Sequence, residues 1–318
     1  MKSGNSRFKR GALLARLLVT ALIFSLIIWL LPMKEVWEAM TRVGWWRWSL
    51  VLLAFGLGHV ILAYKWYRLV VTAGTPFRFG VALRAHMAGL FANVWLPSIV
   101  GGDIIRAAWI SKNQGIAVPA VTGLLDRALD TLALVILVAC GTFLSGNAAG
   151  TTAEPVLRAA GLLLLAGIPL GLLVLHFLRP HHLPAALRTP GTKLLEVTRM
   201  LYNTPAPAIY SLLLALAVQL AFVALNYFLG VAVGIEASFA VWLMAWPLAK
   251  ITALLPVSLG GLGVREAALA VFLAPFAVTG TLAVAEALVW QSILFGFGLL
   301  AGAGLLFSSE TPFRRGKP

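Results

Sequence analysis

Two stretches of the chain place charged side chains directly beside helix-breaking residues. The first, Leu96–Ile110, reads LPSIVGGDIIRAAWI and carries Asp103 and Arg106 after Gly101 and Gly102. Proline and glycine interrupt helices, and a helix that restarts after such a break presents free N–H groups that favour anions. An arginine close to that start adds a planar fork of donors that suits phosphate. The pattern therefore predicts a site for a phosphate-bearing ligand.

The second stretch, Leu255–Leu269, repeats the first about half a chain later. It reads LPVSLGGLGVREAAL, and both stretches share the pattern L-P-x-x-x-G-G-x-x-x-R-x-A, with Leu255 matching Leu96. Upstream, the segment 67–83 matches the segment 227–243 in a register that differs by a single position. Two neighbouring blocks in nearly the same register indicate an internal repeat. The second copy adds these predicted binding residues: Gly260, Gly261, Gly263, Arg265 and Glu266, the last of which would neutralise Arg265 when no ligand is bound.

A third stretch, GLLDRALDTLALV at 123–135, carries three charges early in an apolar run. Asp126 and Asp130 are four residues apart and share one face of a helix, with Arg127 beside that face. Charges inside a membrane are costly and normally face a polar interior or a partner. We expect these residues, together with Lys250, to form a gating or ion-pair network. The alternative is a purely structural cluster that locks this helix to a neighbouring hairpin.

The elements that must position these charges are apolar helices. Of the 318 residues, 60% are hydrophobic and 11% are charged, whereas a soluble domain carries about 25% charge. Six apolar runs approach or reach the ~20 residues that a helix needs to cross a bilayer. Only helices or closed barrels satisfy the backbone in lipid, and these runs do not alternate like barrel strands, so the sequence predicts an all-α polytopic membrane protein. The runs are Leu13–Leu31, Trp48–Tyr64, Thr131–Phe143, Ala159–Phe177, Ser211–Val233 and Thr281–Phe307.

Basic residues indicate which connections face the cytoplasm. Both terminal tails and the connections 65–84 and 178–207 are basic, whereas 145–155 contains no Lys or Arg. The positive-inside rule then places both termini in the cytoplasm. The same rule accounts for the net charge of +14 without nucleic acid, because no basic domain lies outside the apolar runs.

The charge pattern conflicts with a simple crossing at residues 79–100. The segments 65–78 and 106–119 both belong inside, so the apolar segment between them is expected to form a re-entrant hairpin that turns at the proline and glycines. By the same reasoning, 239–277 forms a second hairpin that enters from the opposite side.

The unit of span, hairpin and span then occurs twice within a single transmembrane domain of residues 1–318. The two copies cover about 48–144 and 208–307, and they enter the membrane from opposite sides. This is the inverted repeat that many secondary transporters use. The sequence thus predicts about six full spans plus two re-entrant hairpins, and eight or more full spans are the alternative.

The three charged stretches resemble signature regions of the lysylphosphatidylglycerol synthase transmembrane-domain family, which is also described as flippase-like or as uncharacterised inner-membrane proteins. The resemblance therefore implies a place in the inner (plasma) membrane. The resemblance covers roughly residues 12–307. In two-part members of that family, a membrane unit of this kind moves aminoacylated phospholipid between leaflets, and a separate soluble domain makes the lipid. Because this chain ends at Pro318 without the soluble synthase domain, the resemblance implies a stand-alone translocator and not an enzyme. Stand-alone relatives are associated with glycolipid or isoprenoid-lipid pathways.

We therefore expect a flippase for a phospholipid or polyprenyl-linked (glyco)lipid. Its headgroup phosphate would contact Arg106, Arg265 and the N–H groups after Gly102 and Gly261. No nucleotide, metal or nucleophile motif occurs in the sequence, so no cofactor or metal is expected. The expected partners are membrane lipids. The alternatives are a small-solute secondary transporter and a non-transporting partner of a lipid-modifying enzyme.

Overall fold

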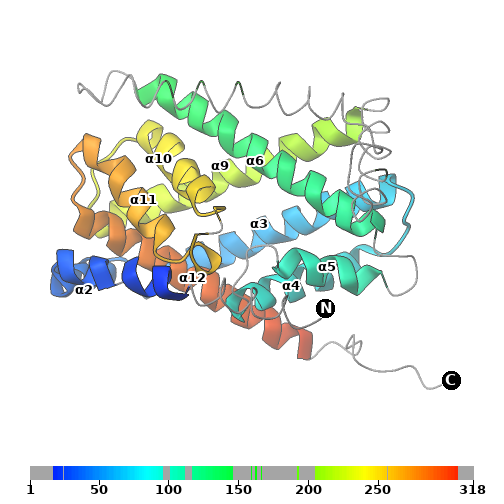
Figure 1. Cartoon of the computed structure of the whole chain (residues 1–318), viewed down its shortest axis with the longest axis horizontal. Coiled ribbons are helices and arrows are strands. Elements are labelled where there is room, and N and C mark those ends of the chain that lie inside the picture. The colour runs from blue at the N-terminus through cyan, green and yellow to red at the C-terminus, as the bar shows by residue number, and fades with distance from the viewer. Residues whose placement is uncertain are drawn as a thin grey trace, which may run out of the picture.

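A computed structural model of the chain describes residues 17–23, 25–95, 101–111, 117–145, 205–255 and 257–306, together with the single residues 159, 162, 166 and 192. Every regular element labelled in these ranges is a helix (Figure 1). The long helices are α3 (Gly44–Thr72), α6 (Ala117–Ser145), α9 (Ala206–Val233) and α12 (Gly280–Leu306). The shorter elements are α2 (Met33–Thr41), α4 (Phe79–Trp95), α5 (Gly101–Ile110), α10 (Phe239–Thr252), η2 (Leu259–Gly261), α11 (Val264–Leu273) and η3 (Ala274–Phe276).

The four long helices contain 27 to 29 residues each, or about 40–44 Å at 1.5 Å per residue. They are long and apolar enough to cross a membrane. The helical segment Leu17–Leu30 and α2 add a fifth candidate span, bent by 91° between its two parts. The all-helical, multi-span class predicted from the sequence is thus confirmed. The span predicted at Ala159–Phe177 lies outside the described residues, apart from its single residues 159, 162 and 166.

Glycines end the first long helix of each half. α9 has Pro207 in its first turn and ends at Gly234, whose φ of +104° makes a left-handed cap. α3 ends in the same way, because Gly74 follows it with a φ of +87°. Gly74 and Gly234 are matched positions of the upstream repeat block, so the two copies share this turn.

Helices α3 and α9 pack together and run in opposite directions. Trp46, near the start of α3, meets Phe228, near the end of α9, with ring centroids 6.2 Å apart. Arg68, near the end of α3, lies 6.0 Å from the ring of Tyr210, near the start of α9. The two helices are therefore antiparallel along most of their length.

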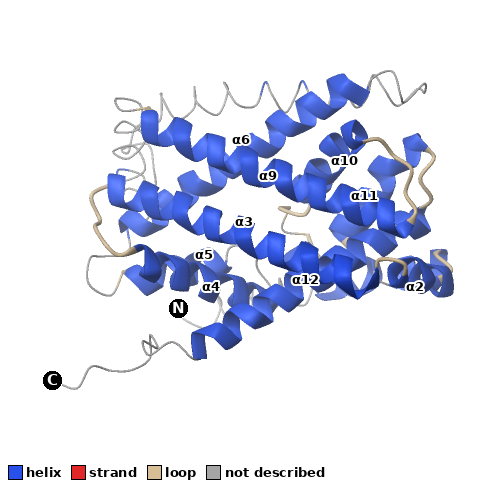
Figure 2. Cartoon of the chain, turned by 180° about the vertical axis from the view of Figure 1, so that it is seen from behind, coloured by secondary structure: helices blue, strands red, loops and turns tan. Residues whose placement is uncertain are grey.

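The short helices form two pairs, and each pair packs on a long helix of the other half (Figures 1 and 2). The α4–α5 pair is joined where the backbone N–H of Gly102 donates to Oδ1 of Asn93 at 2.9 Å. In the α10–α11 pair, a Cβ on Gly261 would lie 2.9 Å from the Cβ of Ala253. Helix α4 docks on α12, whereas α10 docks on α6. The packing is thus reciprocal between the two halves.

Glycines also set how closely these helices approach. A Cβ on Gly89 of α4 would lie 2.7 Å from the carbonyl oxygen of Gly102. On α12, Gly298 and Gly302 lie four residues apart and face Val94 and Phe91 of α4, respectively. Such small-xxx-small spacing is how membrane helices bring their backbones together.

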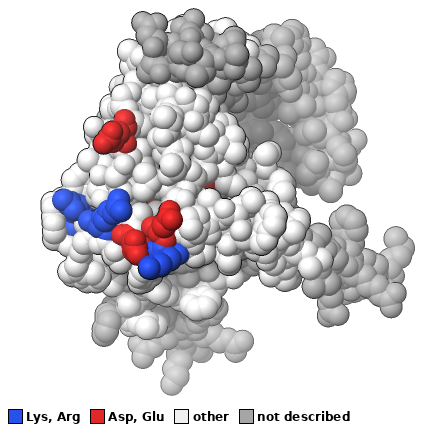
Figure 3. All heavy atoms as spheres, turned by 90° about the vertical axis from the view of Figure 1, so that its left-hand side faces the viewer, with Lys and Arg blue, Asp and Glu red and all other residues white. Residues whose placement is uncertain are grey.

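Charged side chains gather at the two ends of the bundle. Figure 3 views the end where α2 lies, where basic and acidic residues lie side by side in one area and a further acidic patch lies apart from them on an otherwise uncharged face. At the opposite end, residues 66–85 hold three arginines, Arg68, Arg78 and Arg84, and no acid. The two ends therefore differ in charge.

Replacing Gly89 by alanine tests the close approach of α4 and α5. We expect Gly89→Ala to lower the free energy of unfolding by about 1–3 kcal/mol, because the added methyl overpacks the contact. Gly80→Ala on the same helix is the matched control, since a Cβ there meets nothing within 4 Å. Thermal unfolding of the purified protein in detergent measures both variants. Equal loss of stability in the two would contradict the packing described.

Candidate functional site

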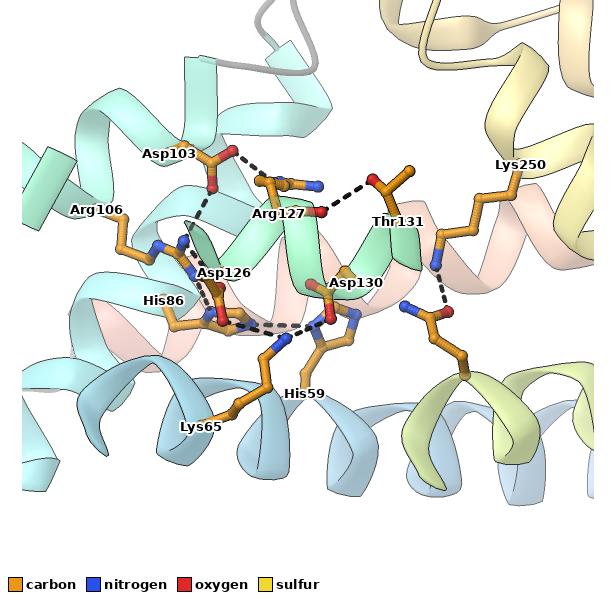
Figure 4. A network of polar contacts seen from close by, with 11 residues as sticks. His59, Lys65, His86, Asp103, Arg106, Asp126, Arg127, Asp130, Thr131 and Lys250 are labelled. Carbon is orange, nitrogen blue, oxygen red and sulfur yellow. Dashed lines mark hydrogen bonds and ion pairs between the residues drawn. The ribbon is translucent and has the colours of Figure 1, made fainter. Parts of the chain in front are cut away.

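Six charged side chains meet between α3, α5 and α6, and we refer to them as the ion cluster (Figure 4). Three are cations and three are acids, so the cluster is neutral when all of them are ionised. In the described part of the chain, no group of three or more His, Cys, Asp or Glu residues could hold a metal ion. The members of the ion cluster are Lys65, Asp103, Arg106, Asp126, Arg127 and Asp130.

The Asp126 carboxylate joins three helices. Its side chain is almost fully buried, and its Oδ1 lies 3.1 Å from Nζ of Lys65 on α3. Its Oδ2 accepts from both terminal nitrogens of Arg106 on α5, each at 3.2 Å. Removing either cation would leave buried negative charge without compensation, which is strongly destabilising. Asp126 therefore ties α6 to both neighbours.

Lys65 contacts Asp130 as well as Asp126 (Figure 4). The four-residue spacing of the two acids puts them on one face of α6, as the sequence indicates, and Lys65 lies opposite that face. The charge pattern placed Lys65 in the cytoplasmic connection 65–84, and this is wrong. Helix α3 continues to Thr72, and Lys65 is fully buried within it.

The guanidinium of Arg106 also contacts a second acid, an aromatic ring and a histidine. It lies 3.3 Å from Asp103 and 4.3 Å from the centre of the Trp66 ring, which adds a cation–π contact to the ion pairs. Its Nη1 also lies 3.5 Å from Nδ1 of His86, whose Nε2 lies 3.1 Å from Nδ1 of His59. Because arginine only donates, Nδ1 of His86 accepts and its Nε2–H donates to His59.

Arg127 differs from the other cations because its side chain is 43% exposed. Its Nε donates to Asp103 at 2.7 Å, and within the described ranges this is the only partner of the side chain. The two terminal nitrogens therefore have no hydrogen-bond partner among the described residues. Two exposed apolar side chains flank this position on the same helices, Leu124 on α6 and Ile104 on α5. Arg127 therefore forms a charged spot within an apolar outer surface.

In the second half, Arg265 is held by Glu266 and Gln291. Its Nη2 lies 2.9 Å from Oε1 of Glu266, so the neutralisation expected from the sequence is present. Gln291 of α12 accepts a second hydrogen bond from the same nitrogen. The other oxygen of Glu266 accepts from the backbone N–H of Gly263 at 2.7 Å, which caps the start of α11.

Lys250 lies apart from the ion cluster with which the sequence grouped it. Its Nζ donates to Oε1 of Gln219 at 2.8 Å, and it lies 4.9 Å from the ring centre of Trp246. These contacts tie α10 to α9. Of the predicted network, Asp126, Arg127 and Asp130 thus meet, whereas Lys250 makes no direct contact with them among the described residues.

Side chains already satisfy part of the backbone that we expected to bind phosphate. The N–H of Gly102 donates to Asn93, and that of Gly263 donates to Glu266. Gly260, Gly261 and Gly263 have φ values of +60°, +80° and +80°, a conformation that favours glycine. These glycines therefore make the turn before α11, and the role of phosphate donor stays a prediction.

Residues 13–302 match the family described as Lysylphosphatidylglycerol synthase TM region. The chain belongs to this family. Comparison with curated proteins and with solved structures found no significant match. Family membership and the long apolar helices make this a multi-pass membrane protein, and the family fits a lipid-related membrane role.

Within this family member, Lys65 is the cluster residue that sequence reasoning missed. It directly follows an apolar run, and a lysine there is typical of a membrane interface. The signal that could have placed it correctly is the apolar sequence beyond it, WYRLVVT, which extends α3 by two further turns. Its partners, Asp126 and Asp130, lie on a different helix far along the chain, beyond the reach of helical periodicity.

Breaking the Lys65 contacts tests the ion cluster. Lys65→Met leaves Asp130 without its cation, and we expect the free energy of unfolding to fall by about 3–5 kcal/mol. The double variant Lys65→Met/Asp130→Asn removes the stranded charge, while Asp126 keeps Arg106, so part of the stability should return. Chemical unfolding of these two variants and of Asp130→Asn alone, in detergent, measures the coupling.

Lys34→Met is the matched control for this experiment. Lys34 pairs with Glu38 at 4.0 Å on an exposed surface, where ion pairs contribute little, so its loss should leave the unfolding midpoint unchanged. Strictly additive effects of Lys65→Met and Asp130→Asn would contradict the contact.

Proposed function

We propose that this protein is a lipid translocator that moves a phospholipid or polyprenyl-linked (glyco)lipid between leaflets. The observation that carries the proposal is the half-exposed Arg127 on α6, a helix long and apolar enough to cross a membrane. Arg127 lies ten residues after the start of α6, or about 15 Å along the helix. A charge at this depth is costly, and such residues mark pathways for ions or substrates. The lipid would enter sideways between α5 and α6.

The surroundings of Arg127 match the two parts of a lipid. Its two free terminal nitrogens form the fork that binds phosphate bidentately. The exposed side chains of Leu124 and Ile104 offer apolar surface for acyl or polyprenyl chains. A small solute would need a polar cavity closed off from lipid, so this arrangement favours an amphiphile over the small-solute alternative.

The first contact with the lipid phosphate is therefore assigned to Arg127, and not to Arg106 or Arg265. Arg106 is only 5% exposed and its guanidinium is shared by two carboxylates, so it becomes available only after these pairs open. Asp103 links the two arginines, because its oxygens contact both. A phosphate that replaces Asp103 on Arg127 would loosen α5 from α6. In this proposal the ion cluster is the gate.

The architecture supports alternation between two sides. The first and last long helices of the two halves have nearly equal lengths, α3 and α9 are antiparallel, and the short pairs dock reciprocally. These are the properties expected of an inverted repeat, in which one half rocks against the other. We therefore include in the proposal an inverted repeat with copies at about 48–144 and 208–307.

The lengths of the short helices support re-entrant hairpins. α4 and α10 contain 17 and 14 residues, or about 26 and 21 Å, and the hydrocarbon core is ~30 Å thick. Neither helix covers the full core, and each turns back at a glycine-rich break. The end that carries Arg68, Arg78 and Arg84 is assigned to the cytoplasm by the positive-inside rule.

A vesicle assay tests the function. Purified protein is reconstituted with headgroup-labelled phospholipids and polyprenyl-phosphate lipids, and an impermeant quencher reports the accessible fraction. We expect the wild-type protein to expose inner-leaflet label to the quencher. Arg127→Ala should slow this by about tenfold or more, because a charge-assisted hydrogen bond contributes ~1.5–3 kcal/mol.

Arg78→Ala is the matched control, since Arg78 is exposed at the same end of the molecule but lies outside the ion cluster. It should translocate lipid at the wild-type rate. An accessible fraction that stays at the protein-free level across the whole lipid panel would overturn the proposal and favour a non-transporting partner of a lipid-modifying enzyme.

A further inference from the structure

The corresponding arginines in the two halves of the chain pair with different acids. The 159-residue register of the internal repeat relates Arg106 to Arg265, and the 160-residue register of the upstream block, when extended to the last long helix, sets Glu286 opposite Asp126. Each half then places an arginine on its second short helix and an acid on its last long helix. In the first half the two side chains form an ion pair at 3.2 Å. In the second half they do not, because Arg265 is held by Glu266 and Gln291.

Glu286 is consequently a buried acid without a partner in the part of the chain that the structure describes. Its residue is 0% exposed, and neither carboxyl oxygen accepts or donates a hydrogen bond. It lines a gap together with Arg265, Asn226 of α9 and Trp246 of α10. Oδ1 of Asn226 and Nε1 of Trp246 are also unpaired. Three helices thus bring unsatisfied polar groups to one place.

The gap is too narrow to admit a water molecule. A carboxylate that has neither water nor a donor is very costly to bury, and such a group takes up a proton instead. A proton also needs no room, whereas a metal cation would need several oxygen ligands at fixed distances. The protonated acid carries an O–H donor, and the unpaired oxygen of Asn226 lines the same gap.

We infer that Glu286 is a proton-binding site and that its proton is the coupling ion of the translocator. The coupling rests on the proposed function, whereas the proton site stands on the geometry alone. When the gap opens, the O–H bond breaks and the proton passes to water. The resulting carboxylate then takes Arg265 from Glu266, which forms the pair that Arg106 and Asp126 already make.

Charge accounting gives the direction of coupling. With Glu286 protonated, Arg265 and Glu266 cancel and the site is neutral. After the proton leaves, the same three groups carry one net negative charge, which repels an anionic headgroup. Proton and anionic lipid are therefore expected to move in the same direction.

The other charged groups on helices packed against α12 do not interfere with this site. On α11 they are Arg265 and Glu266, which are included above. Lys250 of α10 is bound to Gln219, and α9 contributes no charge to the gap. The remaining groups belong to the first-half cluster or to the ends of the molecule: His59, Lys65, Arg68, Arg84, His86, Lys34, Glu35, Glu38 and Arg47.

Infrared difference spectroscopy of the purified protein tests the proton site without any transport. A titration between neutral and alkaline pH should reveal the C=O stretch of one protonated carboxylic acid. The band should vanish in Glu286→Gln, shift in Glu286→Asp, and stay unchanged in the control Glu236→Gln, which alters the loop that precedes α10. A band that persists unshifted in folded Glu286→Gln or Glu286→Asp, or no band in the wild type, would overturn the inference.

Vesicles with a pH gradient test the coupling. One proton per lipid lets a gradient of one pH unit support about a tenfold transbilayer ratio of labelled anionic lipid, since a tenfold ratio corresponds to ~1.4 kcal/mol. Glu286→Gln should build no ratio, whereas the control Glu236→Gln should build the wild-type ratio. Translocation by the wild type that ignores the gradient would refute the coupling and leave the proposed function standing. No translocation at all would refute both, while the infrared result would still decide the proton site.

Discussion

A single buried carboxylate, that of Asp126, holds three helices of this protein together. It forms an ion pair with a lysine of α3 and accepts hydrogen bonds from an arginine of α5, and it lies nearly a third of the way along α6. Taking these charges out of water carries a large desolvation cost, which is offset only if every charge keeps its partner. That constraint explains the balance of three cations and three acids. It also explains why α5 must lie so close to α4 and α6 that glycines are needed at the contact.

The same constraint makes the arrangement suitable for switching. Buried ion pairs have few acceptable geometries, so a change of partner moves whole helices between discrete positions. The two halves of the chain occupy different positions in this structure. In the first half the arginine faces the acid of the last long helix, and in the second half it faces its own neighbour, Glu266. Two halves in different states are what alternation about a shared centre requires.

Much of the fold could be predicted from the sequence, because run length, charge and helix breakers act locally. The long apolar runs indicated the four long helices, and the LPxxxGG stretches indicated where one short helix ends and the next begins. The shared face of Asp126 and Asp130 followed from helical spacing. The partners of these acids could not be predicted, since pairing depends on which helices pack together. Lys65 looked like an interfacial charge for that reason, and the facing of Glu286 could not be deduced before α9, α10 and α11 were placed around it.

Family membership fits a lipid-related membrane role. In the proposed function, the half-exposed Arg127, which is joined to the ion cluster through Asp103, would link the arrival of a phosphate to the opening of α5 from α6. The account therefore depends on the α5–α6 contact being able to open.

The most direct test measures the distance between α5 and α6 by double electron–electron resonance in lipid nanodiscs. Spin labels at Ile104 and Leu124 report it, because both side chains are exposed, and Cys140→Ala removes the one native thiol. We predict two distance populations, with the longer one growing when phosphate-bearing lipid is added and disappearing in Arg127→Ala. A single narrow distance that is the same with and without such lipid would contradict the account.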